Sequence, residues 1–390
     1  MTGTCTCVVQ DNTTIGGYIR IHMSELKLSA VNVLVGRHAV GKSVLMASLY
    51  DSLLQKEDGH HRYDGLTQPI ECSNCTYAEY GIWLPAERVI LPFSRVCEER
   101  EGAERELGQE QIALPRLTAE LLYSSLKNLC RWQRNLAAMH EHQIFSPELH
   151  GMAYSYIMEA KEKAIRTIYD VSGDDEVKRY LNLTFPYVII FEKGEDKPGE
   201  PPYRFIIRDM RSRRVISLRE ASHAASVAAI LSTLSLAAAH AFIGRTVFAI
   251  EEPEEEAHPY AQFILGYVLS YTTLKTWLDP NSYGITLLVT THSEYILSGM
   301  LRATYDLLVV SDTVKPANLD TIKPKVYIVD YADMPRDDEI EVEIREWMPG
   351  DVIPGFFGTA LSLTISPRKL RELYGMSAGK TEKIEDRETT

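Results

Sequence analysis

Positive charge is scarce in this chain. Its 390 residues contain 41 Lys and Arg against 54 Asp and Glu, which gives a formal net charge of −13. This balance argues against a protein coated in basic surface for nucleic acid, although a local basic patch remains compatible with it. The hydrophobic fraction of 45% and the charged fraction of 24% are those of an ordinary soluble globular protein.

We also find no sequence pattern typical of a signal peptide or of a membrane span. The first ten residues, MTGTCTCVVQ, lack the basic region followed by an apolar region that marks a signal peptide, so we expect an intracellular, cytoplasmic protein. Residues 224–243 are uncharged and long enough to span a bilayer. Small residues and hydroxyls dominate this stretch, however, and His240 lies inside it. We interpret it as a helix buried against a sheet and predict no membrane association.

A glycine-rich loop is the most specific feature of the sequence. Residues 36–43 read GRHAVGKS, a complete G-x-x-x-x-G-K-[ST] pattern, between the apolar run 31–35 and the helix-like run 44–50. Glycines let successive backbone N–H groups point inward, while the lysine reaches the β- and γ-phosphates and the serine hydroxyl ligates Mg²⁺. The start of the following helix adds a favourable dipole. We predict nucleoside triphosphate binding by Gly36, Arg37, His38, Ala39, Val40, Gly41, Lys42, Ser43 and Val44.

Two later strands end in residues suited to phosphate chemistry. The apolar run 246–250 delivers Glu251 and Glu252 to its carboxyl end, where the first would anchor Mg²⁺ and the second would polarise the attacking water. The alternative is a solvated acidic loop, which the upstream glycine loop makes less favoured. The run 286–290 leads into His292, which would touch a γ-phosphate, although a lone histidine is usually structural.

Together these motifs resemble the ATP-binding-cassette class of P-loop ATPases, in particular the soluble SMC/RecF/OLD-like group of AAA family ATPases. The resemblance covers roughly residues 15–310 and includes EEPE…HP after the second motif strand and TTHS at 290–293. It implies a Mg²⁺-dependent ATPase in which Glu251 takes the Mg²⁺ side, Glu252 is the catalytic acid and His292 is the switch histidine. Tyr18 matches the adenine-stacking aromatic, with a core tyrosine as the alternative.

The resemblance weakens at the signature and Q-loop motifs. The signature falls on residues 221–225, where Ser222 keeps the hydroxyl that would contact the γ-phosphate of an opposing subunit. Ala224 replaces the family's glycine, and Ala225 replaces a polar residue. Residues 85–88, PAER, lack the expected glutamine, and Glu251 is one methylene longer than the usual aspartate. These departures are compatible with nucleotide binding but put fast turnover in doubt.

The chain is too long for one simple core and predicts about two to three structural units. We expect an α/β fold, a P-loop NTPase cassette with a mostly parallel central sheet, an antiparallel β subdomain and a helical insertion. The predicted parts are 1–92, 93–182, 183–310 and a C-terminal extension, 311–390, whose end from 376 is a polar tail. Antiparallel strands are expected within 7–35, a strand at 80–84, and helices at 117–129, 134–142 and 147–170 without sustained heptads. The β-branched runs 187–191, 204–208, 246–250 and 286–290 suit strands buried on both faces of a parallel sheet.

Four of the six cysteines form two close pairs. Cys5 and Cys7 make a C-x-C pair and Cys72 and Cys75 a C-x-x-C pair, whereas Cys97 and Cys130 are single. Four thiolates would bind structural zinc if the pairs converge. Buried free thiols and disulfides are equally compatible with the pattern.

Several functions remain open on the sequence alone. The leading hypothesis is an ATPase that forms a homodimer on ATP binding and drives a partner protein or DNA transaction. The alternative is a slow or inactive nucleotide-gated clamp or sensor for a partner. Nucleic-acid binding draws on arginines in one hairpin region, Arg204, Arg208, Arg211, Arg213, Arg214 and Arg219, although a solvated basic face is the favoured interpretation. The C-terminal part shows no nuclease pattern, so a nuclease or effector would be a separate chain.

Overall fold

A computed structural model of the chain describes residues 5–8, 14–15, 19–22, 25–37, 40–54, 70–84, 147–172, 187–193, 203–209, 212–216, 224–255, 257–310, 319–332, 340–356 and 365–375. Its strands are β1 (Cys5–Val8), β2 (Thr14–Ile15), β3 (Ile19–His22), β4 (Leu26–Leu28), β5 (Val31–Val35), β6 (Glu71–Ser73), β7 (Tyr80–Leu84), β8 (Tyr187–Lys193), β9 (Tyr203–Asp209), β10 (Arg214–Ile216), β11 (Thr246–Glu251), β12 (Ile285–Thr291), β13 (Lys325–Tyr331) and β14 (Ile340–Glu346). Its helices are α1 (Lys42–Leu53), α5 (Pro147–Ser172), α7 (Ala224–His240), α8 (Pro259–Leu278), α9 (Glu294–Tyr305), the π-helix η1 (Asp306–Val310), α10 (Leu319–Ile322) and α12 (Pro367–Leu373).

The described part is built around an eight-stranded sheet of order β2-β3-β14-β13-β5-β12-β11-β7. The strands from β13 to β7 are parallel to their neighbours in that order, while β14 runs antiparallel to β13 and β2 antiparallel to β3. Strands β5 and β11 are buried along their whole length, because helices cover both faces of the sheet. The fold is therefore mixed α/β with a mostly parallel sheet, in agreement with the prediction.

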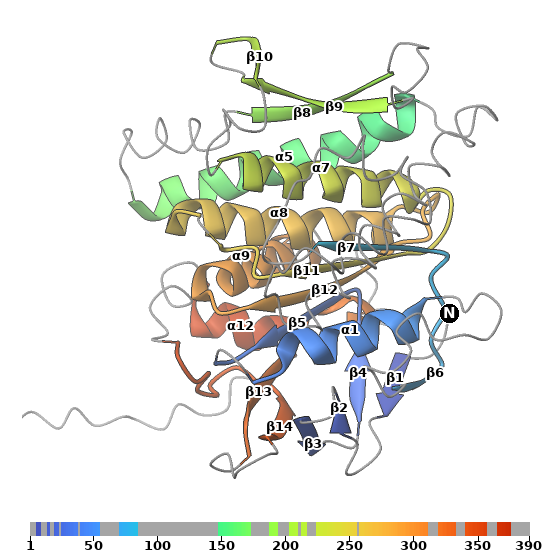
Figure 1. Cartoon of the computed structure of the whole chain (residues 1–390). Helices are drawn as coiled ribbons and strands as arrows, with labels where there is room; N and C mark the ends of the chain where they lie inside the picture. Colours follow the sequence, from blue (N-terminus) through green and yellow to red (C-terminus); the bar gives the residue numbers. More distant parts are fainter. Residues whose placement is uncertain are drawn as a thin grey trace, which may run out of the picture.

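The two faces of the sheet bury different helices, as Figure 1 shows. On β11, Val247 and Ala249 pack into the core that contains α1, whereas Phe248 and Ile250 pack into the core that contains α8 and α9. This alternation follows from the two-residue period of a strand. Helices α5 and α7 form a further layer over α8 (Figure 1). The glycine-rich loop of residues 36–43 leads into α1, which among the described residues is the one helix packed on this face.

Helices α8 and α9 approach each other so closely that two glycines are required. A Cβ on Gly266 would lie 2.1 Å from the carbonyl oxygen of Ile296, and one on Gly299 would lie 2.1 Å from that of Phe263. Backbone contact of this kind has no room for a side chain. The two helices pack closely against each other, and α8 also packs against β12.

Two helices predicted from sequence appear in the structure. The helix expected at 147–170 is α5, and the apolar stretch from 224 forms α7, which packs against β11 and β7 with His240 fully buried. No helix among the described residues is both long and apolar enough to cross a membrane. The helices expected at 117–129 and 134–142 and the polar tail from 376 lie outside the described residues.

The placement of two predicted strands was wrong. The runs 187–191 and 204–208 are strands, but β8 and β9 belong to a separate antiparallel sheet of order β10-β9-β8, not to the parallel sheet. The stretch 194–202 between them is too short for a parallel crossover, which needs about a dozen or more residues. Strand composition located these segments, but the connection length decided how they pair.

The amino-terminal strands pair antiparallel as predicted, β1 with β4 and β2 with β3. Strand β1 also pairs with β6, and two disulfides join them, Cys5–Cys75 and Cys7–Cys72. Among the alternatives left open by the sequence, the described structure thus has the disulfides and no free thiol at these four positions.

Candidate nucleotide-binding site

The loop between β5 and α1 needs glycine at both conserved positions of the phosphate-loop pattern. Gly36 has φ 148°, and a Cβ there would lie 2.0 Å from the carbonyl oxygen of Val329 on the neighbouring strand β13. Gly41 has φ 83° and is the N-cap of α1. Both positions exclude an ordinary side chain without strain. The chain can therefore pass from strand to helix in a tight path with backbone N–H groups available at the helix start.

Lys42, the first residue of α1, is buried with 5% of its surface exposed. Its Nζ donates hydrogen bonds to the carbonyl oxygens of Gly36, at 3.2 Å, and Arg37. Burial lowers the pKa of Lys42 from 10.5 to about 8, and the negative charges of Glu252 and Glu254 oppose this shift. The ammonium is thus held over its own loop and within the field of the acidic residues that follow β11.

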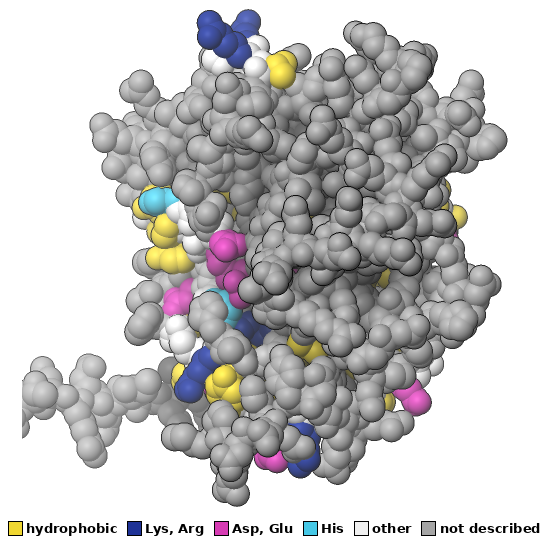
Figure 2. All heavy atoms as spheres, in the orientation of Figure 1, with side chains coloured by type: hydrophobic (Ala, Val, Ile, Leu, Met, Phe, Trp, Pro, Cys, Tyr) yellow, Lys and Arg dark blue, Asp and Glu magenta, His cyan; other side chains and the backbone are white. Residues whose placement is uncertain are grey.

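Three parallel strands bring the remaining predicted groups to the same edge of the sheet. In the register of the strands, Glu251 of β11 lies opposite Thr290 of β12, and Thr291 of β12 lies opposite Val35 of β5. All three strands therefore end beside the glycine loop. The Glu251 side chain is 7% exposed at this edge. Acidic, histidine and basic side chains lie close together at mid-height on this face in Figure 2.

Glu252 and His292 are in direct contact. The Nε2 atom of His292 lies 3.0 Å from Oε1 of Glu252, and the backbone N–H of Glu252 donates to the carbonyl oxygen of Thr290 at 2.9 Å. Glu252 has φ 41°, in the left-handed region that non-glycine residues rarely occupy. Strained backbone that the surroundings hold in place is frequent at functional sites. The structure thus joins two predicted site residues from different strands.

Glu254 also belongs to the site, although the sequence analysis gave it no role. Its Oε2 accepts a hydrogen bond from Oγ1 of Thr291 at 2.9 Å, and its Oε1 accepts one from the backbone N–H of His292. Burial raises the pKa of the Glu254 carboxyl, while these hydrogen bonds act in the opposite direction. In the sequence Glu254 is one acid in a run of acids, and no spacing distinguishes it. Only the tertiary structure shows that Glu254 clamps the TTHS loop, residues 290–293, to the end of β11.

Further hydrogen bonds connect the clamp to α8 and α9. Ser293 is the N-cap of α9, and its Oγ donates to Oε1 of Gln262 on α8 at 2.6 Å. Gln262 in turn donates through Nε2 to the carbonyl oxygens of Ala257, at 2.7 Å, and Glu254, at 3.4 Å. The switch-like loop is therefore attached to the helix that follows the acidic cluster.

The other predicted site residues divide into two groups. Among those that the structure describes, Arg37 is exposed, with its Nε 3.7 Å from Oδ1 of Asp330, and Ser43 is half-buried. Val40 and Val44 are buried in the core of the α1 face, so only the backbone of these two residues is available to a ligand. Tyr18, His38, Ala39, Ser222 and the stretch 85–88 lie outside the described residues. Ala224 and Ala225 form the first turn of α7.

The donor set fits a magnesium ion. Mg²⁺ prefers hard oxygen ligands and is usually held by one or two carboxylates or hydroxyls together with substrate phosphates and water. Ser43 offers a hydroxyl next to Lys42, and Glu251 offers a buried carboxylate at the end of β11. A buried carboxylate beside a phosphate loop is the chemistry that such a cation requires.

No protein-family model matches the sequence, and no curated protein matches it. Among solved structures, similarity is found to an Smc head bound to the C-winged helix domain of ScpA, with 10% identity over 88% of this chain and 97% of the other and a TM-score of 0.35. An Smc head with an extended coiled coil bound to the C-terminal domain of ScpA from Pyrococcus furiosus has 12% identity over 88% and 96%, with a TM-score of 0.38. A nucleotide-free ATP-binding cassette from an ABC transporter has 10% identity over 95% and 98%, with a TM-score of 0.32.

Proposed function

We propose that this chain binds Mg·ATP at the loop of residues 36–44 and hydrolyses it. The observation that carries the proposal is the meeting, at one edge of the parallel sheet, of a buried loop lysine and the Glu252–His292 pair. The loop supplies backbone N–H groups and the Lys42 ammonium to the β- and γ-phosphates. Ser43 and Glu251 would hold Mg²⁺, which when bound neutralises charge on the phosphate oxygens.

Glu252 is the proposed general base. Its carboxylate would accept a proton from a water molecule as the water oxygen bonds to the γ-phosphorus and the bond to the leaving ADP oxygen breaks. His292 lies 3.0 Å from this carboxylate and orients it. Glu254 holds the backbone of His292 and thereby positions the pair. The proposed chemistry therefore uses Lys42 and Ser43 at the start of α1, the acids at and after the end of β11, and the histidine that follows β12.

Turnover by matched variants tests this proposal. Hydrolysis at saturating Mg·ATP would be compared in the parent chain, in Glu252→Gln and in Glu255→Gln, an exposed acid three residues further on. We expect Glu252→Gln to bind ATP normally and to lose hydrolysis, while Glu255→Gln keeps both. Full hydrolysis in Glu252→Gln would show that Glu252 is not the general base.

We further propose that ATP promotes a two-fold dimer in which Ser222 of one subunit meets the loop of the other. The support is the resemblance described above and the position of Ser222 just before α7. Light scattering on Glu252→Gln with and without Mg·ATP would measure the mass. A chain that stays monomeric with ATP bound would favour the second candidate, a slow nucleotide-gated clamp, which Ala224 in place of the family's glycine also favours.

What the ATPase acts on is a separate question. A partner protein or a separate nuclease would be the effector driven by this ATP cycle. The proposed contact surface for DNA is a basic tip at the start of β10, formed by the exposed Arg213 and Arg214. Figure 2 shows this tip at the top of the view. Binding of a DNA duplex that persists in Arg213→Ala/Arg214→Ala would exclude this tip as the contact surface.

A further inference from the structure

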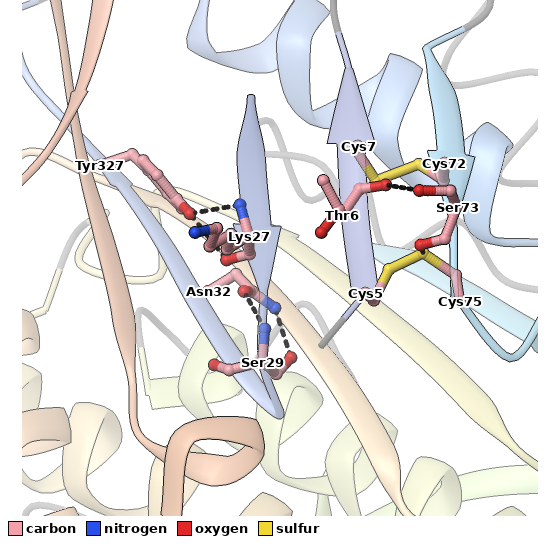
Figure 3. Close-up of a disulfide and its surroundings, with 10 residues drawn as sticks. All are labelled: Cys5, Thr6, Cys7, Lys27, Ser29, Asn32, Cys72, Ser73, Cys75 and Tyr327. Atoms are coloured by element: carbon pink, nitrogen blue, oxygen red, sulfur yellow. Dashed lines mark hydrogen bonds between the residues drawn. A yellow bond between two sulfur atoms is a disulfide. The ribbon is translucent and has the colours of Figure 1, made fainter. Parts of the chain in front are cut away.

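Four cysteine sulfurs converge beside α1. Cys5 and Cys7 are two residues apart on β1 and therefore point to the same side, and Cys7 lies directly opposite Cys72 of β6. Asn74, with φ 56°, turns the chain after β6 and returns Cys75 to Cys5. Figure 3 shows the two pairs bonded side by side between β1 and β6.

Three of the four sulfurs lie close enough together to share a metal ion. The Sγ atoms of Cys5, Cys7 and Cys75 all lie within 4.8 Å of one another, and the Sγ of Cys72 is bonded to that of Cys7. In a tetrahedral zinc site with Zn–S of about 2.3 Å, the sulfurs are about 3.8 Å apart. Cys5, Cys7 and Cys75 therefore lie near the spacing of a zinc shell, and Cys72, held beside Cys7 by its disulfide, is the fourth thiolate after reduction.

The surroundings favour a structural rather than a reactive site. Leu28 and Leu26 of β4 lie opposite Cys5 and Cys7 and join them to the α1 core, where Cys7 is fully buried. Thr6 and Lys27 occupy the alternate positions of the same ladder and so face away from the sulfurs. One side of the cluster is thus packed against apolar side chains, while Cys5, Cys72 and Cys75 remain half-buried.

We propose that the four cysteines form a tetrathiolate zinc site in the reduced chain, of which the two disulfides are the oxidised form. The inference rests on the proposed function, because ATP hydrolysis occurs inside cells, where thiols are generally kept reduced. A dithiol reductant supplies two electrons and two protons to each disulfide and leaves four thiols. Zn²⁺ then displaces the four thiol protons. Soft sulfur ligands in tetrahedral geometry select zinc over magnesium or calcium.

The site would fasten β6 to the amino-terminal strand. Cys5 and Cys75 are 70 residues apart in sequence, and Cys7 and Cys72 are 65 residues apart. Strand β6 packs beside α1, the helix that starts with Lys42. Closing such long loops restricts the unfolded chain whether the link is a metal or a disulfide. Zinc keeps this link intact under reducing conditions, in which disulfides open.

Metal analysis of the full chain tests the proposal. The protein would be expressed with added zinc and purified with a phosphine reductant, and the metal content would be measured by mass spectrometry. We expect about one zinc ion per chain, and loss of it in Cys72→Ser/Cys75→Ser. The matched control is Cys97→Ser/Cys130→Ser, which removes the two other thiols and should retain the metal.

A second measurement does not depend on a variant that folds. Cobalt substituted for zinc in the parent chain should give the visible bands of a tetrahedral ion together with sulfur-to-metal charge-transfer bands. Reduced protein with reactive thiols but no bound zinc or cobalt would overturn the proposal, and so would disulfides that survive the reductant. Calorimetry with Mg·ATP on the same samples separates the two proposals, since metal-free protein that binds ATP contradicts only the zinc site.

Discussion

The two halves of the candidate site are built in different ways. The phosphate-loop half is contiguous, because Gly36, Gly41 and Lys42 lie within the stretch 36–42 that leads from β5 into α1. The acidic half joins Glu252 and Glu254 to a loop about forty residues away, through side-chain contacts with Thr291 and His292. The first half depends on local backbone geometry, whereas the second exists only because β11 and β12 are neighbours. Substitutions in the phosphate-loop half should therefore weaken ATP binding, whereas substitutions in the acidic half should slow hydrolysis.

The largest effect is expected from Lys42→Ala. The lysine would contribute charge-assisted hydrogen bonds to two phosphates, each worth about 1.5–3 kcal/mol, so we expect ATP affinity to fall roughly 10³-fold. Calorimetry in Mg²⁺ measures this change, with the exposed Lys27→Ala as the control lysine. Unchanged affinity would show that the loop does not bind the phosphates.

The next effect is on the acidic half alone. Glu252→Gln should lower the hydrolysis rate by about 10²-fold or more while ATP affinity stays within a few-fold, because a positioned general base contributes on this scale. Single-turnover kinetics with bound ATP measure the chemical step. If Glu251→Gln abolishes hydrolysis and Glu252→Gln does not, the two acids have the opposite roles.

Glu254→Gln tests whether the clamp positions His292. The amide keeps an acceptor oxygen but loses the charge that strengthens the bonds to Thr291 and His292, so we expect about a tenfold lower rate with little change in affinity. A merely structural role would lower thermal stability without changing the rate of folded protein. Thr291→Val, which removes one of the two donors, should have a smaller effect in the same direction.

The smallest effect is a pH dependence of the loop half. Because burial lowers the pKa of Lys42 to about 8, the free protein loses the ammonium proton above that pH, while a bound triphosphate holds the proton. ATP affinity should therefore fall as pH rises, by about fivefold between pH 8 and 9, with proton uptake on binding. Calorimetry in two buffers of different ionisation enthalpy measures the uptake. The stability of the free protein should change in the opposite sense, rising between about pH 8 and 10.5, since the unfolded chain then binds the extra proton.

Part of the fold was predictable because buried parallel strands have continuous apolar sequences. The runs 31–35, 80–84, 246–250 and 286–290 are strands of the central sheet within a residue or two of their predicted ends. The same composition located β8 and β9 but could not assign their sheet, because pairing depends on the connection between them. Composition therefore predicts where a strand lies better than which strand it pairs with.

The phosphate loop was determined by the sequence itself. Its backbone path depends mainly on neighbouring residues in the chain, on two glycines with positive φ and on the strand and helix that flank them, although the close approach of Gly36 to Val329 is supplied by the neighbouring strand β13. The contact of Glu252 with His292, the clamp formed by Glu254 and the pairing of the four cysteines were decided by the tertiary structure. Each of these contacts joins segments far apart in the chain, and the order of the strands in the sheets, which no local pattern encodes, brings them together.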